Sequence, residues 1–237
     1  MPTKVEVGSM WHVYLRRIVL AVFGIFTSLL LVTGMVVLNT VPVEADSSRE
    51  ELTFPFAIEG TDLVAEYFVS YEGDYFEDQS GEFIMDGVAL CVSNQGDAHI
   101  EFASVYIETL DGIYCFEGTC IPPKSTVIIL EKYKSIYPTS PIYLAIGTTK
   151  NAQKKCLLGD LQIVPIDIGR FEVTNRSDYK LEDVTLYYKR YDSWWDIYIG
   201  GITYAISAGT LQAGESKIVF PANYANGYSK VLYATAN

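Results

Sequence analysis

Hydrophobic and polar residues alternate in short runs after residue 51, and turns rich in Gly, Asn, Asp and Pro separate the runs. In residues 184–189, Val184, Leu186 and Tyr188 face one way, while the residues between them face the other. Short alternating strands at intervals of about 8–12 residues are typical of β-sandwiches and small barrels. We therefore predict an all-β fold built from immunoglobulin-like β-sandwiches.

The pattern occurs twice. Residues 89–108 align with residues 170–189 without a gap, at an offset of 81, and in both a strand ends in Asn before a polar turn. Three more blocks follow in the same order: 112–120 with 196–204, 121–130 with 211–220 at an offset of 90, and 141–148 with 230–237 at an offset of 89. We predict two tandem sandwiches, residues 52–150 and 157–237, and two strands within residues 52–71 that enlarge the first.

Residues 18–38 form a run of 21 residues without a charge. As a helix this run is about 31 Å long, close to the thickness of a bilayer core. Lys4, Arg16 and Arg17 precede it, whereas Glu44 and Asp46 follow. We predict a cytoplasmic tail (1–17), a transmembrane helix (18–38), a polar stalk (39–51) and an extracytoplasmic remainder in a plasma-membrane protein.

Two versions of this segment remain open. It is either an uncleaved signal anchor or a long signal peptide that is cut after Ala45, which would release a secreted protein. Val43 and Ala45 supply the small residues that a signal peptidase reads. We favour the anchor, because the run is longer than the apolar region of an ordinary signal peptide.

Charge and aromatic content exclude some classes of function. Residues 46–237 hold 14 of the 17 basic and 27 of the 29 acidic residues, a net charge of −13. Such an acidic surface argues against nucleic-acid binding and against contact with anionic lipid. Aromatic residues make up 14% of the chain and charged residues only 19%, which excludes a disordered protein.

The second repeat carries a combination of motifs: an N-x-S sequence, a YYK triplet, a GGITY segment, an L-x-x-GES turn and a late tyrosine, at Asn175, 187–189, 200–204, 211–216 and Tyr224. It resembles uncharacterised membrane-anchored surface proteins of Clostridia-like Firmicutes. The resemblance covers about the last 70 residues, and the first repeat lacks the YYK and GGITY signatures. It implies an extracytoplasmic β domain and no catalytic residue.

Four cysteines lie after the apolar run. Cys115 and Cys120 flank the four residues FEGT, and a hairpin there would allow a disulfide between them. Cys91–Cys156 would follow by elimination, and four free thiols are the other interpretation. The cysteines lack the CxxC spacing or nearby histidines of a metal site, so we expect no metal or cofactor.

Catalytic signals are weak. His99 lies at a predicted turn without a nucleophile motif nearby, and solvation of the turn is its expected role. The acidic segment 72–82 offers oxygen ligands for Ca²⁺, but its spacing fits no EF-hand, and we favour a solvated loop. A pair of carboxylates for a glycosidase is not singled out. We therefore expect no enzyme.

Aromatic residues crowd the stretch 187–198. If Tyr191, Trp194 and Trp195 lie at a hairpin tip, they present flat apolar faces to a protein or a sugar. The alternative, to which we give slightly more weight, is that Trp195 fills the second core. The leading hypothesis is a non-enzymatic, membrane-tethered surface protein that contacts envelope components or protein partners. The second is a carbohydrate-binding module that uses Trp194 and Trp195.

Overall fold

The computed structural model describes residues 50–237 except 76 and 79. Its elements in the first half are β1 (Phe56–Ala57), β2 (Leu63–Asp74), β3 (Phe83–Asn94), β4 (Ile100–Thr109), β5 (Ile113–Ile121), β6 (Thr126–Leu130) and β7 (Ile142–Asn151). The second half contains the 3₁₀ helix η1 (Leu158–Asp160), β8 (Leu161–Asp167), β9 (Arg170–Asn175), β10 (Leu181–Asp192), β11 (Ile197–Leu211), β12 (Ser216–Val219) and β13 (Ser229–Thr235). The predicted all-β fold is thus confirmed for the described residues.

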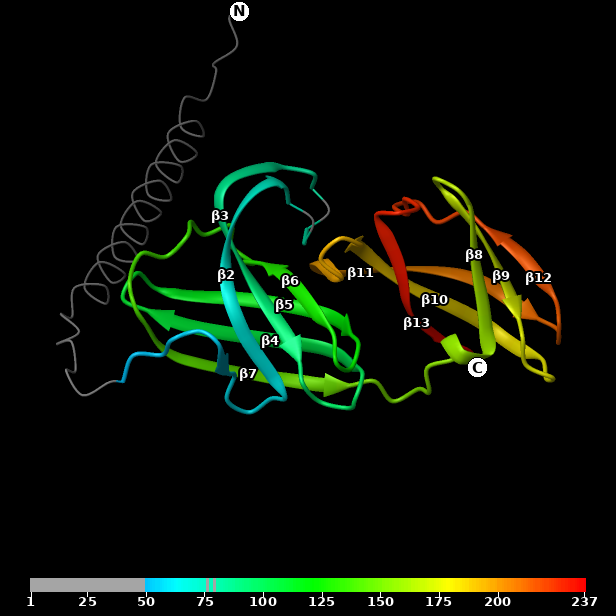
Figure 1. Ribbon diagram of the computed structural model, residues 1–237, viewed down its shortest axis with the longest axis horizontal. Coiled ribbons are helices and arrows are strands. Elements are labelled where there is room, and N and C mark those ends of the chain that lie inside the picture. Colours follow the sequence, from blue (N-terminus) through cyan, green and yellow to red (C-terminus); the bar gives the residue numbers. More distant parts are fainter. Residues whose placement is uncertain (1–49, 76, 79) are drawn as a thin grey trace, which may run out of the picture. The chain divides into compact units, whose positions relative to one another are not determined.

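The strands form three sheets (Figure 1). A seven-stranded sheet has the order β1-β2-β3-β6-β11-β10-β13, and two three-stranded sheets have the orders β5-β4-β7 and β12-β9-β8. The seven-stranded sheet passes from the first half to the second where β6 and β11 pair in parallel, through Val127↔Tyr198 and Ile128↔Ile199.

Each half packs its three-stranded sheet against its part of the seven-stranded sheet. In the first half, Leu90 and Val92 of β3 and Val105 and Ile107 of β4 belong to one buried cluster, the first core. In the second half, residues of β9, β10 and β11 share a second core, including Phe171, Val173, Val184, Leu186, Tyr188 and Leu211. The alternation of apolar residues that predicts two-layered packing is therefore realised in both halves.

The pairing registers of the two halves coincide at most of the aligned positions. Ser93 of β3 pairs with Thr126 of β6, and Thr174 of β9, 81 residues later, pairs with Ser216 of β12, 90 residues later. The third and closing strands differ from the sequence alignment. Tyr106 pairs with Cys115 and Tyr187 pairs with Ala205, so the third strands match at an offset of 90, whereas the alignment of 112–120 with 196–204 has an offset of 84. In the closing strands, Tyr106 pairs with Ile146 and Tyr187 pairs with Tyr233, so the offset is 87 and not 89.

The same comparison extends the repeated unit by one strand. Leu63 of β2 pairs with Asn94, and Leu161 of β8 pairs with Asn175. The sequence pattern predicts the strands of residues 52–71, which include most of β2, as an addition to the first half alone. In the structure β8 takes the corresponding place in the second half, so β2 is part of the shared arrangement.

One buried asparagine closes the turn in each half. The Asn94 side-chain amide donates to the carbonyl oxygens of Ala98 (3.0 Å) and Pro122 (3.0 Å), and its Oδ1 accepts from the Gly96 N–H. Asn175 donates in the same way to Tyr179 (2.7 Å) and Leu211 (3.2 Å), and accepts from Ser177. Since Asn175 is fully buried, its N-x-S sequence is part of the fold.

The hairpin predicted between Cys115 and Cys120 is wrong. β5 runs as one strand through both residues and pairs with β4 along its length. Five residues of extended chain separate the two Cα atoms by about 17 Å, far beyond the reach of a disulfide. All four cysteines are free thiols in the structure.

The predicted tail, the apolar run 18–38, the site after Ala45 and most of the stalk lie outside the described residues. Among the residues that are described, no helix has the length and apolar character needed to cross a membrane. These predictions about the N-terminal region therefore stay predictions.

Candidate functional site

The hairpin between β10 and β11 carries two exposed tryptophans at its tip. The Trp194 side chain is 87% exposed and that of Trp195 is 71% exposed, so the alternative that Trp195 fills the second core is wrong. A carboxylate oxygen of Asp192 accepts the N–H of Trp194 (2.8 Å) and of Trp195 (3.2 Å). This local bonding fixes the turn and leaves both indole rings in solvent.

Tyr191 lies below the tip and supports it. Its ring packs on Tyr198 with 5.3 Å between centroids, and the Lys230 ammonium lies 4.3 Å from its centre. The Tyr191 hydroxyl donates to Asp196, and this hydrogen bond, with the nearby charge of Lys230, lowers the pKa of Asp196 below its ordinary value. The predicted trio is therefore two exposed rings on one half-buried ring, with charged groups beside them.

A buried lysine fixes the stem of this hairpin. Lys189 is fully buried, and its ammonium donates to the carbonyl oxygens of Gly200 (2.9 Å), Gly201 (2.7 Å) and Ile202 (2.8 Å). Burial lowers the pKa of Lys189, because the charged form loses its hydration. The three carbonyls satisfy all three ammonium donors, which offsets part of that loss.

Glu77 ties the same stretch of β11 to the first half. Its carboxylate accepts the N–H groups of Gly201 (2.6 Å), Ile202 (2.8 Å) and Leu130 (3.1 Å). A Cβ on Gly201 would lie 2.0 Å from the backbone oxygen of Glu117, so this close approach requires glycine. We call Glu77, Lys189 and the backbone of 200–202 the clasp.

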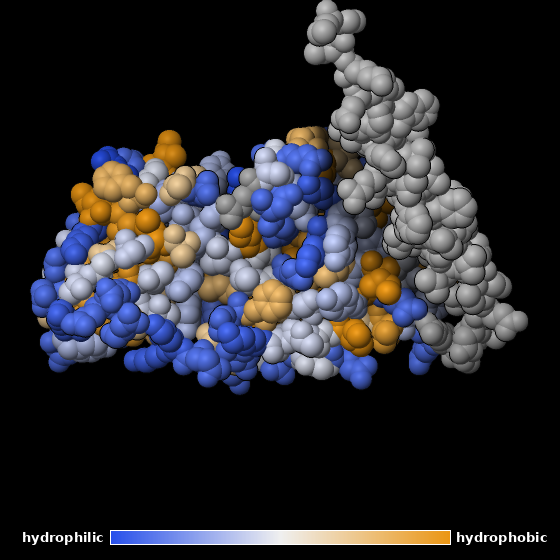
Figure 2. All heavy atoms as spheres, turned by 180° about the vertical axis from the view of Figure 1, so that it is seen from behind, coloured by the Kyte–Doolittle hydropathy of each residue, from blue (hydrophilic) through white to orange (hydrophobic). Residues whose placement is uncertain are grey.

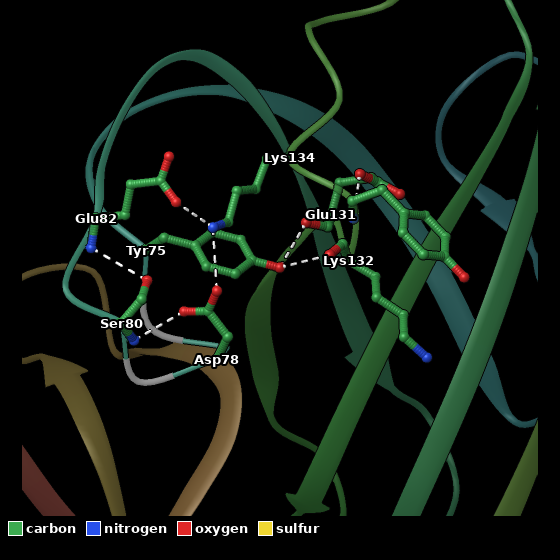
Figure 3. A network of polar contacts seen from close by, with 8 residues as sticks. Tyr75, Asp78, Ser80, Glu82, Glu131, Lys132 and Lys134 are labelled. Atoms are coloured by element: carbon green, nitrogen blue, oxygen red, sulfur yellow. Dashed lines mark hydrogen bonds and ion pairs between the residues drawn. The ribbon is translucent and has the colours of Figure 1, made fainter. Parts of the chain in front are cut away.

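The acidic segment 72–82 is thus not simply a solvated loop. Besides Glu77 in the clasp, Asp78 and Glu82 both pair with the Lys134 ammonium, 3.0 Å away in the case of Asp78 (Figure 3). The Tyr75 hydroxyl donates to the carbonyl oxygens of Glu131 and Lys132. Across the described part of the chain, no group of three or more potential ligands is arranged to hold a metal.

A second feature is an open pocket of about 660 Å³ lined by residues of both halves, including His99, Phe102, Cys120, Tyr187 and Tyr233. The His99 ring stacks on Tyr233 with 4.1 Å between centroids, and its Nε2 lies 3.2 Å from the Cys120 sulfur. The predicted role of His99 in turn solvation does not describe this half-buried ring. Sequence reasoning missed the pair, because the two residues meet only through the pairing of β4 with β5.

The electrostatics of this pair oppose catalysis. Burial lowers the pKa of His99 to about 4 and raises the pKa of Cys120 to about 12. Both groups are therefore neutral near pH 7. A cysteine nucleophile needs its thiolate, commonly stabilised by a protonated histidine, and the surroundings here disfavour that state.

Exposed apolar area alone does not single out a contact surface. Figure 2 shows the hydrophobic residues of one face in separate patches among hydrophilic ones. The tryptophan tip differs from such patches because its rings extend from a turn whose stem is fixed by the clasp. In comparisons with protein-family models, curated proteins and solved structures, no match was found.

Proposed function

We propose that the protein is a non-enzymatic, membrane-tethered surface protein whose tryptophan tip contacts an envelope component or a protein partner. Residues 18–38 anchor it, residues 39–51 space it from the bilayer, and two immunoglobulin-like units, residues 52–150 and 157–237, stand outside the cell. Release of the outer part by cleavage after Ala45 is the alternative for its localisation.

The charge distribution supports this location. Three basic residues precede the apolar run, and a net charge of −13 lies in residues 46–237. Basic residues are retained on the cytoplasmic side of a membrane span. An acidic outer part is repelled by anionic lipid headgroups and stands away from the bilayer.

The observation that carries the contact function is the exposure of Trp194 and Trp195 on a fixed hairpin. Tryptophan is enriched at the centres of protein interfaces, where its large ring is buried at a low cost in side-chain entropy. The clasp holds the stem before any partner arrives, so that binding needs little further ordering. The neutral thiol–imidazole pair of His99 and Cys120 supports a non-catalytic role.

Protease accessibility tests the proposed orientation. In intact cells or protoplasts that express the full-length chain with a C-terminal tag, added protease should remove the tag. A cytoplasmic marker protein should stay intact in the same sample. The orientation would be reversed if the tag stayed intact in whole cells. In that experiment, digestion of the cytoplasmic marker after lysis would show that the protease was active.

Carbohydrate binding is a second candidate, and the exposure of both indole rings favours it. Flat aromatic faces stack on sugar rings, and Asp192, Asp196 and Lys230 offer polar groups nearby. Trp11 is the third tryptophan of the chain, so a Trp11→Phe variant limits tryptophan fluorescence to the tip. Cell-wall or plant glycans should then shift the emission, and Trp194→Ala should weaken the response. No shift across the glycan panel would reject this candidate.

A further inference from the structure

Two of the four thiols point away from the first core. In β3, Leu90 and Val92 belong to the first core, so Cys91 between them points to the opposite face. In β5, Tyr114 and Phe116 belong to the same core, and Cys115 points away from it. Neither thiol therefore faces the first core, and the predicted Cys91–Cys156 pairing does not fit this arrangement.

Cys120 and Cys156 do share the first core. Cys120 is buried in it on the same face of β5 as Tyr114 and Phe116, and its backbone φ of 55° departs from the extended conformation of the strand. Cys156 is partly buried and packs against the same cluster. It belongs to residues 152–157, the linker between the two halves.

Hydrogen bonds hold the linker beside the pocket that Cys120 lines. The Ala152 N–H donates to the carbonyl oxygen of His99 (2.8 Å), and the Leu157 N–H donates to that of Ala234 (2.9 Å). Between these points the Tyr233 hydroxyl donates to the carbonyl oxygen of Lys154. His99 Nε2 lies 3.2 Å from the Cys120 sulfur and the His99 ring stacks on Tyr233, so contacts lead from Cys120 to the stretch of the linker that carries Cys156.

We infer that Cys120 and Cys156 are a redox pair that closes to a disulfide by exchange with a small-molecule or protein disulfide. Cys120 loses its proton to hydroxide and attacks the disulfide R–S–S–R, which gives a Cys120–S–S–R bond and releases a thiolate, R–S⁻, that takes up a proton from water to become R–SH. Cys156 then loses its proton and attacks the Cys120 sulfur, and the second R–SH leaves. Two protein thiols are oxidised and one external disulfide is reduced to two thiols.

This bond would tie the linker to the first half. It would close the chain from residue 120 to residue 156 and restrict the movement of residues 152–157 beside the pocket. The inference concerns the chain alone and holds whether or not the tryptophan tip binds a partner. Because burial keeps Cys120 protonated near pH 7, the exchange should be slow and should accelerate as the pH rises.

Peptide mapping tests the pairing. The reduced full-length chain is incubated with oxidised glutathione in mild detergent, its remaining thiols are alkylated, and the protein is digested without reduction. Cleavage after glutamate separates the four cysteines into peptides 83–101, 109–117, 118–131 and 132–172. The expected result is a link between 118–131 and 132–172 and a fall in free thiols from four to two.

Variants identify the steps. In Cys156→Ser, Cys120 should retain a bound glutathione, because the second attack is lost. In the control Cys91→Ser, the link should form as in the wild type. His99→Phe should leave the final pairing unchanged. A linked peptide that contains Cys91 or Cys115, a wild-type chain that stops at the glutathione adduct, or four thiols that persist after prolonged incubation would overturn the inference.

Discussion

The two halves of the described chain share their framework and differ in what is built on it. Asn94 and Asn175 make corresponding hydrogen bonds, and the strands that flank them pair in the same registers. The differences concentrate on the second hairpin. Lys189 occupies the place of Glu108, and β11 has 15 residues where β5 has nine. The second hairpin therefore carries the clasp and the tryptophan tip, and the first has a short turn at residues 110–112.

This difference separates positions that specify the fold from positions that specify a contact. Residues present in both halves, such as the buried asparagines, are explained by the folding of each half. Trp194 and Trp195 have no such explanation, because the first half folds in the same registers without them. Lys189 stabilises the stem that carries them. We expect substitutions in the first group to lower stability equally in both halves and substitutions at the tip to leave it unchanged.

The largest expected effect comes from Lys189→Met. The apolar replacement keeps much of the buried volume but leaves three carbonyl oxygens without their donor and the Glu77 carboxylate without a nearby positive charge. Losses of this kind cost about 3 kcal/mol of the free energy of unfolding, which denaturant titration measures.

Lys150→Met is the matched control. The Lys150 side chain is 62% exposed, and its ion pair with Glu101 is a surface contact worth about 0–1 kcal/mol. Equal losses in the two variants would contradict the assigned role of the clasp.

Asn94→Ala and Asn175→Ala should each cost about 2 kcal/mol, since each removes a buried amide and leaves carbonyl oxygens unsatisfied. Equal costs would support the equivalence of the two halves. Thermal unfolding of each single variant measures these losses of stability. A loss for one variant and none for the other would contradict the equivalence of the two halves.

A pH effect between about pH 4 and 6.5 is expected from His99 of the first half and not from its counterpart in the second half. Burial lowers the pKa of His99 from 6.5 to about 4, whereas its counterpart Lys180 is exposed. Between these two pH values the unfolded chain binds a proton that the folded chain does not, so the free energy of unfolding rises with pH across this window, by about 2 kcal/mol. His99→Phe keeps a ring on Tyr233 and should remove this slope. An unchanged slope would assign it to other groups.

The smallest expected effect on stability is that of Trp194→Ala and Trp195→Ala. Both side chains are mostly in solvent, so the free energy of unfolding should stay within about 0.5 kcal/mol of the wild type. A loss above 2 kcal/mol would mean that the rings pack in the folded chain and would remove the argument for a contact surface.

The sequence predicts the fold where local pattern decides it. Alternation locates most strands, and the asparagine at each strand end locates the repeated turns. It does not predict the parallel pairing of β6 with β11, because no local pattern marks which strand edges meet. Glu77 looks like one carboxylate among several in an acidic loop, and only its contact with Gly201 and Ile202 distinguishes it.

The candidate site could be predicted only in part, because long-range contacts decide the rest. A cluster of aromatic residues is visible in the sequence, but whether Trp195 is buried depends on the turn that Asp192 caps. The His99–Cys120 pair depends on the register of β4 with β5, and the straight course of β5 removes the hairpin expected between Cys115 and Cys120. Long-range pairing thus decides what composition and spacing leave open.

Site-specific photocrosslinking in intact cells tests the central claim most directly. A photoreactive phenylalanine analogue is placed at Trp194 in the full-length chain, and at Tyr133 as a control, because Tyr133 is a comparably exposed aromatic residue of the first half. The account predicts a discrete adduct with an envelope component from position 194 and none from position 133. The absence of an adduct at 194, or the same adducts from both positions, would contradict it.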